Sequence, residues 1–304
     1  MGDITVKEID YETFGRCVEL CNGKISLVAT LDFGPRIIRF GFTDEENELC
    51  DNSPIAVKSG YGEWRMFGGH RLTHSPENVP RTYMPDDKPV EYIPVSNGIR
   101  LTQESETWTQ IRKEMEITFE AGKNSVNILQ RLTNNNAWPV ELAVWGITVM
   151  AQGGREIIPL AQKDTGSLPN RSLVLWPYSD IKDRRFHLLD RYILLEQDPE
   201  AEEAFKIGIN NENGWVAYLN HNNLFVKRCE YAAGKNYPDF GVSYETYVND
   251  AVLEMEFLSP IEKMDINESL TLVETWELIK NVALEDESLH SIDKLVESYI
   301  VKSE

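Results

Sequence analysis

A polar stretch at residues 64–86, WRMFGGHRLTHSPENVPRTYMPD, carries side chains suited to acid–base chemistry. It includes two of the five histidines, His70 and His74, which flank an arginine, a leucine and a threonine. Paired glycines and several prolines predict a loop here. Long polar loops often form sites, although an ordered surface loop held by its own side chains has the same composition. His70, Arg71 and His74 are expected to point into a polar cleft, and Arg71, His74, Arg81 and Tyr83 are expected to bind its ligand.

A second candidate lies at residues 236–250, NYPDFGVSYETYVND. β-branched and polar residues alternate there, so a strand would place Glu245, Tyr247 and Asn249 on one face. A carboxylate among such groups can bind a hydroxyl or accept its proton, but an exposed edge-strand glutamate gives the same pattern. Glu254 and Glu256, on the next expected strand, are open to the same two interpretations.

Several further side chains have two readings. In a strand, Lys227 would point to the face opposite Val226. It could then be a surface charge, or it could lie in a cleft and pair with hydroxyl and carboxylate groups. Trp64, Tyr83 and Trp145 offer flat faces of the kind that stack on sugar rings, although tryptophans in a β-rich chain usually belong to the core.

The composition excludes some classes of partner. The 304 residues carry a formal charge of −20, which disfavours nucleic acids and anionic membranes and leaves neutral sugars unaffected. A phosphorylated substrate would require Arg71, Arg81 and Lys227 to converge.

Neither a cofactor nor a metal is expected. Nucleotide-binding glycine motifs and zinc motifs are missing, and the turn-forming residues around His70 and His74 argue against a metal-binding helix. The four cysteines form no CxxC pair, and neither a signal peptide nor an apolar span is evident. We therefore expect a cytoplasmic protein.

Strand patterns dominate the sequence. Asn22-Gly23 predicts the turn of a hairpin over residues 17–29, and further strands are expected at 36–42, 111–119, 125–133 and 140–150. Later strands are expected at 172–176, 191–196, 214–219, 224–231, 241–248, 251–258 and 270–279.

Helical patterns are few. Residues 284–301 predict one C-terminal helix capped by Asp286 or Ser291, and residues 199–204 predict a single helical turn. The whole pattern predicts an all-β protein of one domain, residues 1–304, with a large antiparallel sandwich over about 12–281.

The motifs resemble the aldose 1-epimerase, or galactose mutarotase-like, superfamily. The resemblance covers most of residues 15–280 and is carried by GPRII (34–38), GGHRLTH (68–74), WPVELAVW (138–145), the strand with Glu245, and DINESL (265–270). It is closer to an uncharacterised bacterial branch with the signatures GGHRxxH…RTYxPD and YPD…ExYxND. The resemblance implies a large antiparallel supersandwich and a carbohydrate ligand.

The resemblance also implies residue roles. Family mutarotases use a glutamate to take the proton from the anomeric O1, which Glu245 matches, and a histidine to protonate the ring O5. His70 or His74 falls in the region of the family's first histidine. Trp145 stands where the family has its proton-donating histidine, so either His70, His74 or Lys227 supplies that proton or the pocket only binds a sugar.

Three functions are therefore weighed. The first is a carbohydrate-binding enzyme similar to aldose 1-epimerases, with Glu245 as base and His70 as acid. The second is a non-catalytic sugar-binding module. The third is a sugar hydrolase or lyase that pairs Glu245 with Asp239 or Glu256. The ligand-binding residues expected for the first also include Trp145, Lys227 and Asp239.

Overall fold

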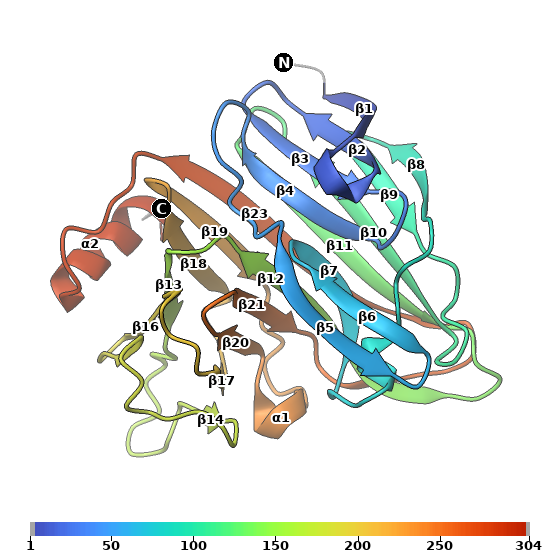
Figure 1. Cartoon of the computed structure of the whole chain (residues 1–304). Helices are drawn as coiled ribbons and strands as arrows, with labels where there is room; N and C mark the ends of the chain where they lie inside the picture. Colours follow the sequence, from blue (N-terminus) through green and yellow to red (C-terminus); the bar gives the residue numbers. More distant parts are fainter. Residues whose placement is uncertain (1–3, 302–304) are drawn as a thin grey trace.

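The computed structural model describes residues 4–301, most of which form two large antiparallel sheets stacked face to face (Figure 1). In spatial order the strands of the 11-stranded sheet are β1 (Thr5–Asp10), β2 (Arg16–Cys21), β3 (Ile25–Thr30), β4 (Arg36–Phe42), β7 (His70–Ser75), β12 (Val140–Met150), β21 (Leu253–Leu258), β20 (Tyr244–Val248), β17 (Phe205–Ile209) and β14 (Leu173–Leu175), with β22 (Glu262–Met264) paired to β12. The all-β antiparallel sandwich expected from the sequence is confirmed.

The second large sheet has 10 strands. In spatial order they are β15 (Phe186–Leu188), β16 (Tyr192–Glu196), β13 (Arg155–Pro159), β18 (Trp215–Asn220), β19 (Asn223–Cys229), β23 (Ser269–Lys280), β11 (Ser125–Asn134), β10 (Ile111–Phe119), β9 (Gly98–Thr102) and β8 (Glu91–Val95). A separate hairpin of β5 (Ser53–Ser59) and β6 (Gly62–Phe67) precedes β7. Short 3-10 turns are η1 (Glu12–Phe14) and η2 (Arg81–Tyr83).

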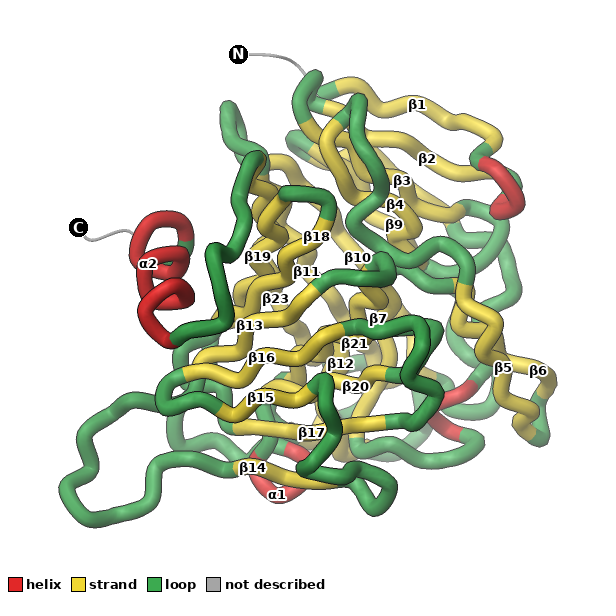
Figure 2. The backbone as a smooth tube through the Cα atoms, turned by 60° about the vertical axis from the view of Figure 1, so that its left-hand side comes forward, coloured by secondary structure: helices red, strands yellow, loops and turns green. Residues whose placement is uncertain are grey.

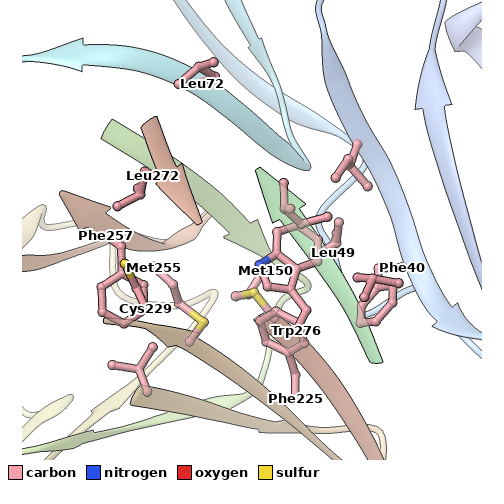
Figure 3. Close-up of a cluster of buried hydrophobic side chains, with 14 of the residues drawn as sticks. Phe40, Leu49, Leu72, Met150, Phe225, Cys229, Met255, Phe257, Leu272 and Trp276 are labelled. Atoms are coloured by element: carbon pink, nitrogen blue, oxygen red, sulfur yellow. The ribbon is translucent and has the colours of Figure 1, made fainter. Parts of the chain in front are cut away.

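The core lies between the two large sheets, where alternate residues of each strand meet. Figure 3 shows Phe40 of the first sheet beside Phe225 and Trp276 of the second. The ring of Trp276 packs edge-on against both phenylalanines, with ring centroids 5.5 Å apart in each pair. This apolar packing fixes which face of each strand points inward, because a shift of one residue would turn every side chain over.

The expectation of a loop over residues 64–86 is wrong for its first half. β6 and β7 occupy it, and β7 lies inside the large sheet between β4 and β12. Gly68 and Gly69 adopt positive φ values of 94° and 64°, and a Cβ on Gly69 would lie 2.0 Å from the carbonyl oxygen of Ile37. The glycines therefore serve a tight turn that brings the chain against its neighbour, rather than a flexible loop.

One long helix, α2 (Leu289–Tyr299), packs its apolar face on the outer side of the second sheet (Figure 2). Its cap is Ser288, whose side chain accepts a hydrogen bond from the backbone N–H of Ser291, so neither expected cap is correct. Asp286 instead accepts hydrogen bonds from the backbone N–H of Ser288 and the hydroxyl of Ser291.

One short segment that was expected to be helical is not, and another forms a short helix that was not expected. Residues 199–204 form a turn and no helix. The carbonyl oxygen of Ala201 accepts a hydrogen bond from the Arg185 guanidinium. The four-residue α1 (Pro238–Gly241) contains Asp239 and Phe240 in left-handed conformations. None of the described helices is both long enough and apolar enough to span a membrane.

We expect Ser288→Ala to lower the free energy of unfolding by about 1 kcal/mol, because the helix loses the acceptor for an N-terminal backbone N–H. Urea unfolding measures this loss. Ser298→Ala, at an exposed position of the same helix, is the control and should change stability little. Equal effects of the two substitutions would contradict the assigned cap.

Candidate functional site

A pocket of about 180 Å³ lies on the outer face of the 11-stranded sheet. The hairpin β5–β6 and the segment that follows β7 form its walls, and the side chains of β7, β12, β17, β20 and β21 form its floor. Its polar and aromatic lining residues are Trp64, Arg71, Glu77, Tyr83, Trp145, Tyr178, Lys206, Tyr247 and Glu254. Aliphatic contacts come from Ile55, Val57, Met66 and Ile147.

Strand pairing places charged groups from distant parts of the chain in two adjacent rows. In one row Ile147 pairs with Arg71 on one side and with Glu256 on the other, and Glu256 pairs with Glu245. In the next row Tyr247 pairs with Glu254 and with Lys206. All these side chains point outward because their neighbours in sequence face the core.

Lys206 ties the two rows together. Its Nζ lies 2.8 Å from Glu245 Oε2 and 3.0 Å from Glu256 Oε2, and it sits over the rings of Trp145 and Trp176. Burial disfavours its charge, but the two carboxylates outweigh burial and raise the pKa of Lys206 well above its usual value. Lys206 is therefore a permanent positive charge in the floor of the pocket.

Glu254 is a buried carboxyl group in the lining of the pocket. Its side chain is only 7% exposed, and its Oε1 has no hydrogen-bond partner within the described chain. Burial raises the pKa of Glu254 to about 7, with a further contribution from the charge of Glu256, while Arg71 and Lys206 oppose the shift. A carboxyl group that titrates near neutrality can both accept and return a proton.

Aromatic side chains form the walls. The Arg71 guanidinium lies 4.5 Å from the ring centroid of Trp64, which meets Tyr83 edge-on at 5.2 Å. The Tyr83 hydroxyl donates a hydrogen bond to Glu77. On the floor, the indole N–H of Trp145 donates to Glu256 over 2.9 Å.

Solved structures of other proteins have a similar architecture. A candidate mutarotase from Salmonella typhimurium has a TM-score of 0.56 at 10% identity, over 92% of this chain and 95% of the other. A galactose mutarotase-like protein from Clostridium acetobutylicum has a TM-score of 0.51 at 10% identity, over 91% and 99%. The chain has the galactose mutarotase-like fold.

A tetratricopeptide (TPR)-domain containing protein from Parabacteroides distasonis has a TM-score of 0.61 at 12% identity, over 90% of this chain. This chain spans 50% of that protein's length. No family model matches the sequence, and no curated protein matches it either. The galactose mutarotase-like fold is thus supported by architecture at low sequence identity.

On this galactose mutarotase-like fold, three of the expected ligand-binding residues line the pocket: Arg71, Tyr83 and Trp145. Glu245 lies beside them beneath Lys206 and is 1% exposed, with its Oε1 unpartnered within the described chain. The sequence placed Glu245 and Tyr247 on one face, and the structure agrees.

His70 does not face the pocket. It is fully buried between the sheets, where its ring nitrogens lie 2.9 Å from Thr148 Oγ1 and 3.2 Å from Gln130 Oε1. Glu245 and His70 therefore lie on opposite faces of the same sheet and cannot bracket one sugar ring. The cause is strand parity: His70 directly precedes the outward Arg71 in β7, and adjacent residues of a strand point to opposite faces.

The remaining candidates also lie elsewhere. Lys227 is neither on the surface nor in the pocket: it is buried between the sheets, 3.3 Å from Glu274 Oε1 and 2.8 Å from Thr148 Oγ1. His74 and Arg81 line a different cavity, and Asp239 lies in α1, outside the pocket lining.

Sequence reasoning missed Lys206, Glu77 and Tyr178. Lys206 lies in the short strand FKIGI, whose single polar side chain among apolar ones marks an outward position, but its partners become visible only when β17 pairs with β20. Glu77 lay inside the expected polar loop, and no motif or periodicity distinguished it from the other polar residues there.

Proposed function

We propose that this pocket binds a monosaccharide and that the protein acts on it as an aldose 1-epimerase-like enzyme, with Glu254 as the base. The observation that carries the proposal is the position of Glu254, a buried carboxyl group with an unpartnered oxygen in a pocket of aromatic and hydroxyl groups. The catalytic base in this proposal is thus Glu254, rather than the Glu245 expected from the sequence.

The size and charge of the pocket favour one neutral sugar ring. Drug-sized ligands occupy cavities of roughly 300–1,000 Å³, and this one measures about 180 Å³. Arg71 and Lys206 offset Glu77 and Glu254, so the lining carries little net charge. Aromatic faces suit the C–H face of a pyranose, and the polar groups suit its hydroxyls.

The proposed reaction needs one proton acceptor and one donor. Glu254 takes the proton from the anomeric hydroxyl, C1=O1 forms, and the C1–O5 bond breaks as O5 gains a proton. The Tyr83 hydroxyl is already donated to Glu77, which leaves Tyr178 and Tyr247 as candidate donors in the lining. Burial raises the pKa of each, so both keep their protons at neutral pH. Ring closure on the other face of the aldehyde returns both protons. The positive charge of Lys206 favours negative charge that develops nearby.

The second candidate is a sugar-binding module without catalysis. In residues 4–301 no histidine lines the pocket, and the indole of Trp145 is already bonded to Glu256. A pocket of this kind binds hydroxyl groups whether or not it transfers protons.

Magnetisation-transfer NMR across a panel of aldoses and uronic acids tests the proposal. We expect faster exchange between the anomers of at least one sugar, with a rate that rises between about pH 6 and pH 8 as Glu254 loses its proton. The sign follows because only the ionised carboxylate accepts the proton. Selective line broadening for one sugar without faster exchange would support the binding module instead. A rate that does not change through this range would exclude Glu254 as the base.

A further inference from the structure

A second cavity, of about 270 Å³, lies on the other side of β7 from the sugar pocket. Its floor is apolar, formed by Ile111, Val140 and Leu142. Trp108 and Trp138 also line it and are 44% and 63% exposed. Exposed tryptophans beside an apolar cavity are typical of a surface that binds a planar ring.

His74 supplies an unexplained polar group in this cavity. Its side chain is 1% exposed, and neither Nδ1 nor Nε2 has a hydrogen-bond partner in the part of the chain that the structure describes. Burial lowers the pKa of His74 well below its usual value, with Lys113 and Arg81 adding to the effect. The imidazole is therefore neutral, and offers one donor and one acceptor to a ligand.

Arg81 supplies a positive charge at the same cavity. Its guanidinium donates a hydrogen bond to the carbonyl of Pro76, while its Nε is buried and unpartnered. No carboxylate within residues 4–301 forms an ion pair with Arg81. Nearby Lys113 is already neutralised by Glu106 at 2.5 Å, so Arg81 is the positive group left for a ligand. Glu141 is the carboxylate in the lining, and it is exposed.

We propose that this cavity binds a small planar apolar ring that carries one anionic group, as in an aromatic carboxylate. The ring would contact Trp138 and the aliphatic floor, the anion would pair with Arg81, and His74 would gain a hydrogen-bond partner. A sugar fits less well, because apolar groups dominate the floor and offer few partners for hydroxyls. The inference is independent of the proposed function at the other pocket.

The test is a titration of the whole protein, labelled with ¹⁵N-histidine, with benzoate. We expect the His74 ring signals, assigned with His74→Asn, to shift, and the signals of the exposed histidines to stay in place. Benzamide, the neutral analogue, should bind about tenfold more weakly because a charged hydrogen bond is lost.

Variants at the cavity separate the contributions. Arg81→Gln should weaken benzoate binding about tenfold while leaving benzamide unaffected, and Trp138→Ala should weaken both ligands. Arg65→Gln, at an exposed arginine of β6, is the matched control and should change neither affinity. Glu141→Gln should tighten benzoate binding, because it removes the like charge.

Several results would overturn the inference: unshifted His74 signals at saturating benzoate, equal affinities for benzoate and benzamide, or unchanged binding in Trp138→Ala. Anomer exchange measured in the same samples reports on the other pocket. It should not change in Trp138→Ala, so failure of one proposal is distinguishable from failure of the other.

Discussion

Glu254→Gln is expected to reduce enzymatic anomer exchange by about 10²–10⁴-fold, the usual contribution of a positioned acid–base group. The amide keeps the size of the carboxyl group but cannot accept the proton from O1. Sugar binding should survive, since the amide still offers hydrogen bonds. Magnetisation-transfer rates and sugar affinities, measured on the same samples, separate the two effects.

Glu245→Gln is the matched control for Glu254→Gln. Glu245 lies on the neighbouring strand, also buried, but its Oε2 is engaged by Lys206 and it does not line the pocket. We expect its substitution to reduce exchange much less. The reverse result, with exchange lost in Glu245→Gln and retained in Glu254→Gln, would assign the base to the glutamate that the sequence resemblance indicated.

Lys206→Met is expected to lower the free energy of unfolding at pH 7 by about 3–5 kcal/mol, because it leaves buried carboxylates without their cation. Glu245 and Glu256 are 1% and 0% exposed, so water cannot replace the lost ion pairs. Urea unfolding monitored by tryptophan fluorescence provides the measurement. Lys235→Met removes an exposed pair with Glu262 and should cost less than about 1 kcal/mol.

The pH dependence of the Lys206→Met variant gives a second check. Burial already raises the pKa of Glu245 well above its usual value in the wild type, with Lys206 opposing the shift, so the loss of Lys206 raises this pKa further. The folded variant then binds more protons than the unfolded chain, and more than the wild type does, so its stability falls more steeply as pH rises above the pKa of an unfolded glutamate. The loss relative to wild type should be smaller at pH 5 than at pH 7. A combined Lys206→Met, Glu245→Gln and Glu256→Gln variant should recover part of the stability. An equal loss at both pH values would contradict this account.

Periodicity was a good guide to those strands whose alternation is long. The strand expected at 111–119 from its alternation has those bounds in β10, and the strands expected at 36–42 and 140–150 without an alternating pattern have theirs in β4 and β12. Alternation also gave the correct face for Glu245 and Tyr247. The success at 111–119 and the success at Glu245 share a cause, since a period of two over many residues is hard to produce by any other structure.

β7 was missed because its flanking glycines and prolines resemble a loop and its side chains are polar. Because the segment was expected to be a loop, the alternation of faces along a strand was not applied to it. His70 and Arg71 were therefore both assigned to one cleft, although they point to opposite faces of the sheet. Lys227 was misread for a different reason. Its partner Glu274 reaches it through the pairing of β19 with β23, a long-range contact that no local pattern reveals.

β7 serves two cavities at once. Arg71 lines the pocket proposed to bind a sugar on one face, and His74 lines the second cavity on the other. A single-residue insertion or deletion inside this strand would exchange the two sets of side chains, and it would also turn Leu72 out of the core. Evolution can therefore replace individual side chains of β7 one at a time, but it can change the length of this strand only in steps of two residues without altering both cavities together.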